Sequence, residues 1–391
     1  MAAPLVAYVA ARNALNEAGG QRNASVVLPP PSIWAEMRQV MRTARRPRER
    51  LPVNALDVAE RGAVKLPLAY EPYFIAARAE EQAGRYQRAT VLMEEARRRR
   101  PSATSVRFLL LGYYSLANAY QKAIDEADMA MRVNGRSATL ILPAFAKLVA
   151  ADPKARQAIA VALAKQPGWR DAFLDVAANE GLSPEAAAAL VADVRRLAPS
   201  RRPGAEEAFL VRSLVNAGEV QRARTLWESY LPAGEGQPGT IFDGTFRGLM
   251  GMAPFVWTFG ANEDGNAEIA KAGAGGPSML EANYFGDSVM NLAEQTLALK
   301  PGRYRLSSSY RGESSAEDVR LSWTITCLRA NKPIAELPLD PLGPVAAKRE
   351  VIIAVPASGC QGQKLALVGQ PTDLARNLNA QILNVSLVPL G

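Results

Sequence analysis

Apolar positions in the first part of the chain recur with helical spacing, and the helical segments come in pairs. On a 34-residue grid that starts at Tyr70, small residues return at the same two positions in successive copies: Ala55, Ala89 and Ala123 at one, Gly62, Ala96 and Ala130 at the other. Small residues at a fixed interval let two paired helices approach closely, and larger side chains between them fill the seam to the next pair. The pattern therefore predicts a stack of antiparallel helix pairs.

Beyond Ser137 the grid loosens, but the breaks between helices stay clear. Proline and glycine divide this stretch into predicted helices at 139–150, 154–165, 169–179 and 184–197, followed by a last copy of the grid from Gly204. Ser183-Pro184-Glu185 has the residue types that favour a helix start. The helical region is thus expected to cover 36–232.

The pattern changes to alternation in the second half of the chain. Leu321–Cys327 places apolar side chains on one face and hydroxyls on the other, as in a half-buried strand. Further strands are expected at 255–259, 304–311, 334–337, 350–355, 364–368 and 380–389. About eight short strands with one polar face predict an antiparallel β-sandwich. The expected domains are an N-terminal segment at 1–35, helical repeats at 36–232, a Pro- and Gly-rich linker at 233–249 and a sandwich at 250–391.

Composition fits two folded domains and argues against common kinds of catalysis. The chain has 391 residues, of which 48% are hydrophobic and 21% are charged. It contains no histidine, which removes the commonest general base and the commonest metal ligand. Two cysteines cannot form a four-cysteine zinc site. We expect no catalytic residues, no metal site and no cofactor.

The positive charge does not indicate a nucleic-acid site. The net charge is +8, and the excess lies in residues 1–239. Its densest runs, 45–50 and 97–100, fall in a predicted loop and at a predicted helix C-terminus, where arginine is favoured by solvation and by the helix dipole. Neither run has the interleaved aromatics that stack bases, so no nucleic-acid partner is expected. An acidic polymer stays open as a partner.

The cysteines, Cys327 and Cys360, allow two interpretations. They form one disulfide, which implies an oxidising compartment, or they are two buried thiols. The disulfide is the favoured alternative. No stretch of the sequence is long and apolar enough to span a membrane, and the apolar opening of residues 1–12 is either ordinary chain or the remainder of an N-terminal anchor.

The 34-residue pattern resembles the tetratricopeptide repeat, over roughly 36–232 and most specifically at 70–134 and 204–230. In that family the first helix of each pair lines a groove that holds a peptide or another protein chain. The resemblance implies a protein partner, and the family's groove positions fall here on Phe74, Arg78, Phe108 and Arg212. The same side chains could instead cover a neighbouring repeat. The family's lysine and asparagine clamp for carboxylates is absent.

The segment Leu299–Leu306, with the pattern Leu-x-Pro-Gly-x-Tyr-x-Leu, resembles a hairpin of jelly-roll carbohydrate-binding modules, and this likeness covers roughly 250–390. It implies an acidic or neutral polysaccharide as ligand. The candidate binding residues lie on the expected polar face and in the neighbouring loop-strand: Asn283, Tyr284, Arg305 and Arg311. Each of them would otherwise be solvated surface. Trp257 and Trp323 are expected in the core because of strand alternation.

Helical repeats followed by such a sandwich resemble cell-envelope proteins of Gram-negative bacteria that produce polysaccharides. The resemblance implies a periplasmic protein, held to the inner membrane by an N-terminal helix where one is present, that assists assembly or export of a surface polysaccharide. One alternative is a protein–protein adaptor whose sandwich is structural. The other is a glycan-processing enzyme, which the missing histidine and the lack of an acid–base pair disfavour.

Overall fold

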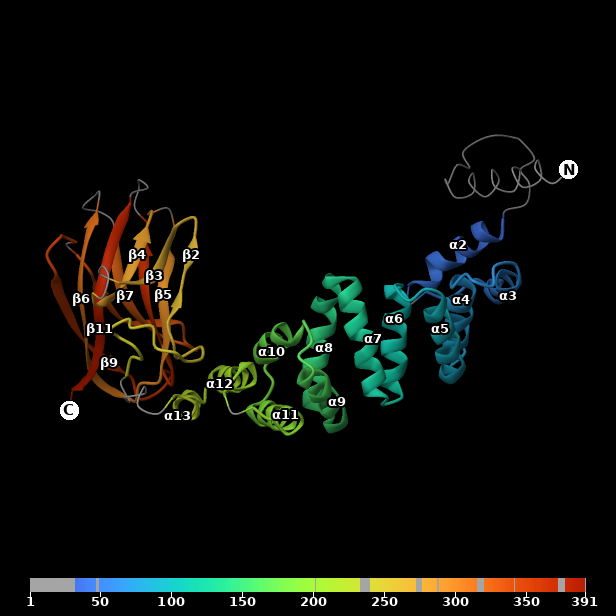
Figure 1. Cartoon of the computed structure of the whole chain (residues 1–391), viewed down its shortest axis with the longest axis horizontal. Coiled ribbons are helices and arrows are strands. Elements are labelled where there is room, and N and C mark those ends of the chain that lie inside the picture. Colours follow the sequence, from blue (N-terminus) through green and yellow to red (C-terminus); the bar gives the residue numbers. More distant parts are fainter. Residues whose placement is uncertain are drawn as a thin grey trace, which may run out of the picture. The chain divides into compact units, whose positions relative to one another are not determined.

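The computed structural model describes residues 32–46, 49–200, 202–232, 240–271, 276–286, 288–314, 320–340, 342–371 and 377–390. Along the chain, helices are followed by an antiparallel β-sandwich (Figure 1). The chain forms two compact units, Met1–Arg170 and Asp171–Gly391. Most of the expected segment 1–35 and the first part of the expected linker lie outside the described residues.

The helical part follows the predicted pairs closely. The helices of the first unit are α2 (Ile33–Ala44), α3 (Ala55–Lys65), α4 (Glu71–Gln82), α5 (Tyr86–Arg99), α6 (Thr104–Leu116), α7 (Tyr120–Val133), α8 (Ala138–Ala151) and α9 (Pro153–Ala164), with a 3₁₀ turn η1 at Gly135–Ser137. The second unit contains α10 (Arg170–Asn179), α11 (Pro184–Leu197), α12 (Ala205–Ala217) and α13 (Val220–Glu228). Within the first unit, consecutive helices pack as antiparallel pairs.

The recurring small residues bring the paired helices together. Ala77 of α4 and Ala89 and Ala96 of α5 are completely buried at the α4–α5 contact. At Gly62 of α3 there is no room for a side chain, because an added Cβ would lie 2.7 Å from Sδ of Met37. Close helix approach therefore explains both repeated small positions.

The arginine run at the end of α5 is part of the helical packing. The Arg99 guanidinium lies 3.7 Å from the centre of the Tyr73 ring, and its Nε donates to the Pro67 carbonyl at 2.7 Å. Arg100 also lies over an aromatic ring, that of Tyr70. Stacked guanidinium groups of this kind stabilise the contact between neighbouring helices.

A bidentate ion pair joins α11 to α12 in the second unit. The Arg195 guanidinium binds both carboxylate oxygens of Glu207, and the backbone N–H of Gly204 donates to the same carboxylate at 2.7 Å. Burial acts to raise the pKa of Glu207, but these hydrogen bonds outweigh it and the pKa lies below its ordinary value. The carboxylate is thus held ionised at the start of α12.

Two antiparallel sheets face each other in the sandwich. The strands are β1 (Thr258–Phe259), β2 (Ala261–Asn262), β3 (Gly265–Lys271), β4 (Ser278–Tyr284), β5 (Met290–Leu297), β6 (Gly302–Ser314), β7 (Arg320–Cys327), β8 (Lys332–Pro338), β9 (Ala347–Val355), β10 (Gln363–Gln370) and β11 (Leu378–Leu390). One sheet has the order β1-β5-β10-β7-β8, and the other has the order β2-β3-β4-β11-β6-β9. The predicted fold class, helical repeats followed by an antiparallel jelly-roll sandwich, is confirmed.

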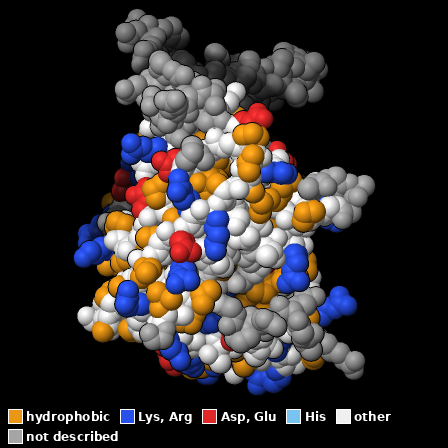
Figure 2. Space-filling view, turned by 90° about the vertical axis from the view of Figure 1, so that its left-hand side faces the viewer, with side chains coloured by type: hydrophobic (Ala, Val, Ile, Leu, Met, Phe, Trp, Pro, Cys, Tyr) orange, Lys and Arg blue, Asp and Glu red, His pale blue; other side chains and the backbone are white. Residues whose placement is uncertain are grey.

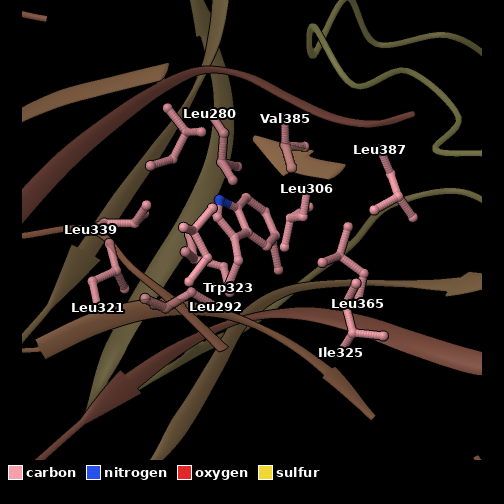
Figure 3. Packing of buried hydrophobic residues seen from close by; sticks show 14 of the residues in the cluster. Leu280, Leu292, Leu306, Leu321, Trp323, Ile325, Leu339, Leu365, Val385 and Leu387 are labelled. Carbon is pink, nitrogen blue, oxygen red and sulfur yellow. The ribbon is translucent and has the colours of Figure 1, made fainter. Parts of the chain in front are cut away.

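Trp323 of β7 lies at the centre of the sandwich core (Figure 3). Leucine, isoleucine and valine side chains from both sheets surround its fully buried ring, and the indole N–H donates to the Ser308 hydroxyl at 3.1 Å. Trp257 is partly buried against the same core and lies 5.6 Å from the Trp323 ring. The prediction that both tryptophans belong to the core is confirmed.

The last helix pair shares a second core with the sandwich. Trp227 of α13 is fully buried, with its ring 4.9 Å from that of Phe242 and 5.6 Å from that of Phe255. Its indole N–H donates to the Met252 carbonyl at 2.7 Å. The segment that contains Phe242 is fixed in turn by Gln295 of β5, whose amide binds the backbone N–H and carbonyl of Phe242, both at 2.9 Å. The expected linker at 233–249 does lie between the helices and the strands. Its described part, from Thr240, is packed against the sandwich and the last helix pair.

A disulfide joins Cys327 to Cys360, with a Cα–Cα distance of 5.0 Å. The predicted pairing is confirmed. Leu328, next to the bridge, packs in the core shared with α12 and α13, and Gly362 lies against Val220 of α13. The bridge therefore holds together the two loops that receive the last helix.

Candidate functional site on the outer face of the six-stranded sheet

The outer face of the six-stranded sheet carries rows of polar side chains that cross several strands. The strand register aligns Asn266, Asn283 and Asn379 in one row over β3, β4 and β11. The next row contains Glu268, Glu281, Gln381 and Arg311, and it extends to β6. Because alternate side chains of a strand point to opposite faces, all of these groups face away from the core.

One half of this face is a network of hydrogen bonds. The Asn379 amide donates to Oδ1 of Asn283 at 2.7 Å and to a carboxylate oxygen of Glu281 at 3.2 Å. The Arg311 guanidinium donates to Oε1 of Gln381 at 2.7 Å. These contacts fix the orientation of the side chains, so donors and acceptors are arranged before any ligand binds.

The other half of the face is basic and aliphatic. Arg305 of β6 is exposed, and the register places Val388 of β11 and Ile352 of β9 on either side of it. These two aliphatic residues are 54% and 53% exposed. Figure 2 shows the side of the sandwich that lies on the left in Figure 1, where Lys and Arg side chains are scattered among hydrophobic ones.

A cleft of about 480 Å³ opens beside β11. It forms because β4 pairs with β11 only as far as Ile382, beyond which the 240–249 segment lies along β11. Val385 N–H donates to the Gly244 carbonyl at 2.8 Å there. A register shift in β11 between Ile382 and Asn384 accompanies the change. The size falls within the range usual for small-ligand sites.

The walls of the cleft offer hydroxyl, amide and guanidinium groups. The residues that line it are Thr240, Ile241, Phe242, Asp243, Gly244, Thr245, Arg247, Leu249, Asn384, Val385, Ser386 and Leu387. Ser386 also joins the cleft to the polar face, because its hydroxyl lies 2.9 Å from that of Ser307 on β6. Ser307 itself is buried, and the exposed Val388, two residues beyond Ser386 on β11 and opposite Arg305, connects the cleft to the basic half of the face.

The tryptophan and tyrosine rings of the sandwich lie in or against its core, whereas Phe285, just after β4, is 37% exposed. Tyr284 was expected to offer a stacking surface beside Asn283, but it is completely buried and its hydroxyl donates to the Ser288 carbonyl at 2.7 Å. That expectation is wrong, because adjacent residues of a strand point to opposite faces. Tyr310 is buried too, and burial raises the pKa of its hydroxyl. Among the described residues, no tryptophan or tyrosine of the sandwich is exposed.

The structure places the sequence-predicted residues of the sheet in different environments. Asn283 and Arg311 lie half-buried in the polar network, and Arg305 is exposed in the basic half. The cleft residues Arg247, Asn384 and Ser386 were not predicted from the sequence. The alternating polar residues of β11 could have indicated the last two. Nothing local marks Arg247, because its position depends on the packing of the 240–249 segment.

Two of the predicted groove residues of the helical part are packing residues. Phe74 and Arg78 of α4 are 0% and 1% exposed. Arg78 binds Glu81 and donates to the Ala44 carbonyl at 3.0 Å, so neither side chain is available to a partner. These side chains are buried because the backbone at the end of α2 and just after it lies against α4. The Ala44 and Arg46 carbonyls accept from Arg78, and the Glu49 carbonyl accepts from Gln82. This segment covers the groove positions of α4.

The other two predicted groove residues are partly accessible. Phe108 of α6 is half-buried, and beside it Gly112 is exposed while Leu116 is 70% exposed. Arg212 of α12 is half-buried and forms an ion pair with Asp175 of α10. Of the four predicted residues, Phe108 and Arg212 have partly accessible side chains, and Phe74 and Arg78 are buried.

The part of the chain that the structure describes holds no cluster of three or more acidic, cysteine or histidine residues arranged to bind a metal ion. Within the same ranges, no helix has the length and apolar character needed to cross a membrane.

Comparison with known proteins gives weak structural likenesses only. No protein-family model and no curated protein sequence matches the chain. Among solved structures, a family 16 carbohydrate-binding module is 18% identical with a TM-score of 0.28, covering 38% of this chain and 99% of the module. TmCBM61 in complex with β-1,4-galactotriose is 13% identical with a TM-score of 0.26, covering 41% of this chain and all of the module (100%). The enzymatically active domain of bacteriophage CBA120 tailspike protein 4 is 11% identical with a TM-score of 0.28; the match covers 39% of this chain but only 21% of that protein. Likenesses this weak do not indicate what the chain binds.

Proposed function

We propose that this chain is a non-enzymatic scaffold protein of the bacterial cell envelope, in which the helical repeats bind a protein partner and the sandwich binds a polysaccharide. The observation that carries the proposal is the outer face of the six-stranded sheet. It combines fixed amides and carboxylates with a cleft of about 480 Å³ lined by hydroxyls and an amide. Such groups match the hydroxyls of a sugar chain, which need both donors and acceptors.

The helical part supports the protein-binding half of the proposal. Its paired helices follow the tetratricopeptide pattern, and α6 exposes Leu116 together with Gly112 and part of Phe108. An exposed apolar strip beside a glycine leaves space for an apolar segment of another chain. The groove of this proposal therefore begins at α6, since the segment after α2 covers α4.

The disulfide supports an envelope location. Bridges such as Cys327–Cys360 form and persist in oxidising compartments, of which the bacterial periplasm is one. The absence of histidine from the sequence supports a binding role over catalysis.

Glycan-array binding by the full chain tests the proposal. Ser386→Tyr places a large ring in the cleft and should abolish binding, whereas Thr326→Tyr, on the outer face of the other sheet, should leave it unchanged. Circular dichroism and melting temperature should match the unmodified chain in both variants. If the unmodified chain binds no glycan on the array, or if the Ser386 variant binds as well as the control, the carbohydrate-binding function is wrong.

A second candidate function, a protein–protein adaptor with a structural sandwich, is favoured by the core shared between α13 and the sandwich. Repeat arrays need a terminal cap that covers their last apolar face, and here Phe242 and Phe255 cover Trp227. A chain that captures a protein partner yet binds no glycan on the array would fit this candidate.

A further inference from the structure

The charge of Arg305 is not neutralised by the sheet around it. Its cross-strand neighbours, Val388 and Ile352, are aliphatic, and within the described ranges its guanidinium makes no ion pair or side-chain hydrogen bond. Glu350, on the adjacent row, lies 3.9 Å from the Lys348 ammonium instead. Arg311 differs, because Gln381 holds its guanidinium. Arg305 is therefore a cation available to a ligand.

Arg247, in the wall of the cleft, is similarly available. Its side chain is 65% exposed and its guanidinium lies 3.9 Å from the Asp243 carboxylate, at the outer limit of an ion pair. That carboxylate already accepts the backbone N–H groups of Arg247, Gly248 and Leu249, at 2.8, 2.8 and 3.1 Å. The Asp243 carboxylate is thus used mainly to accept backbone hydrogen bonds of the loop at 247–249, and its ion pair with the Arg247 guanidinium is weak.

These two arginines belong to one continuous surface. Arg247 lines the cleft together with Ser386 of β11, and Val388, two residues further along β11 and 54% exposed, lies opposite Arg305. Residues two apart on a strand are about 7 Å apart, so Val388, and Arg305 opposite it, lie about 7 Å further along the strand than Ser386. A chain that fills the cleft would thus pass the second arginine.

The ligand has to be held by polar groups and charge. Neutral sugars commonly stack on exposed aromatic rings. No tryptophan or tyrosine in the described part of the sandwich is exposed, and the exposed Phe285 follows the end of β4 that pairs with Leu378, away from the part of β11 that lines the cleft. Guanidinium groups bind carboxylates and other planar or tetrahedral anions in a forked geometry, with stronger hydrogen bonds than neutral pairs make. We propose, on the basis of the function proposed above, that the polysaccharide is anionic and that Arg247 and Arg305 bind its charged groups.

The test uses the full chain on an array of uronate-containing and sulfated glycans, each with a neutral counterpart, such as polygalacturonate and its fully methyl-esterified form. The charge-reversing variants are Arg247→Glu and Arg305→Glu. Arg320→Glu is the matched control, because Arg320 is an exposed arginine on the other sheet. We expect binding to the anionic members only, with affinity that falls as salt rises.

Each reversal should weaken that binding at least tenfold, since one charge-assisted hydrogen bond is lost and a repulsion is added. The control should bind as the unmodified chain does. Arg305→Lys should bind with intermediate affinity, because lysine keeps the charge but not the fork.

Binding to neutral and anionic members alike, without effect of the reversals, would overturn this inference and leave the carbohydrate-binding function standing. Binding to no glycan would overturn both. Equal losses in the Arg320 control would show that net charge acts non-specifically, which also overturns the assignment to Arg247 and Arg305.

Discussion

Replacing Trp227 by alanine should destabilise the sandwich, although the residue lies in a helix. The ring is fully buried against Phe242 and Phe255, and its N–H satisfies the Met252 carbonyl. Removing a buried tryptophan costs about 3–5 kcal/mol. In a unit of this size each kcal/mol corresponds to roughly 2–4 °C, so the unfolding transition of the second unit should fall by about 6–20 °C.

Trp169 provides the matched control in the first unit. It is buried there against Phe145, with ring centres 5.9 Å apart, and its N–H donates to Asp128 at 2.9 Å. Trp169→Ala should destabilise the first unit by a comparable amount and leave the strands unaffected. Calorimetry gives the two transitions, and hydrogen–deuterium exchange of peptides from β5 and β10 assigns them.

The opposite pattern would refute the shared core. If Trp227→Ala accelerates exchange in α10–α13 but leaves β5 and β10 protected as before, the last helices are an appendage of the sandwich and not part of its core.

The same reasoning predicts that a cut between residues 232 and 240 exposes the apolar surface of Trp227 on one fragment and of Phe242 on the other. A cut after Arg170 leaves these contacts intact.

Three further predictions concern stability. Replacing Cys327 and Cys360 by alanine opens a loop with a sequence separation of 33 and should cost about 3–4 kcal/mol in the chain-entropy model, measured by denaturant unfolding; unchanged stability would contradict it. The pKa of Glu207 is lowered in the folded chain, so the ionised carboxylate stabilises the fold above the ordinary pKa of about 4.5, and this stability is lost as pH falls through the folded pKa. Melting scans below pH 4.5 should show the loss, and the Glu207→Gln variant should lose less stability over the same pH range. Arg78→Ala should destabilise the first unit by about 3 kcal/mol because it removes one partner of a buried ion pair, whereas Arg212→Ala, which breaks a half-exposed pair, should cost less than about 1 kcal/mol by thermal unfolding.

Local patterns predicted the elements well where breakers and periodicity agreed. Pro184–Leu197 has the same bounds in the sequence prediction and in α11, because serine, proline and a following glutamate define its start. Leu321–Cys327 differs from β7 by one residue, since the alternation of a half-buried strand is strong there. β3 was missed: its core-facing positions are Gly265, Ala267 and Ile269, and two of these three residues are small, so the alternation signal is weak.

The sites were harder to predict because they depend on contacts between distant segments. The repeat grid gives Phe74 and Arg78 the positions of groove residues, but it holds no information on the segment after α2 that covers them. The cleft arises where β4 leaves β11 and the 240–249 segment replaces it, an arrangement determined by long-range pairing. Tyr284 is a different case, since strand alternation alone separates it from Asn283.

The core shared by α13 and the sandwich also affects the order in which the chain can fold. Trp227 is synthesised before Phe242, Phe255 and the strands that hold them, so the nascent chain presents an indole whose packing is incomplete. The loops that receive α13 are complete only when Cys360 has been made and has met Cys327. We therefore expect the earlier helix pairs to fold during synthesis, and α12 and α13 to acquire protection from hydrogen exchange late, together with the disulfide. During this interval the apolar surface that α12 and α13 bury in the shared core stays exposed.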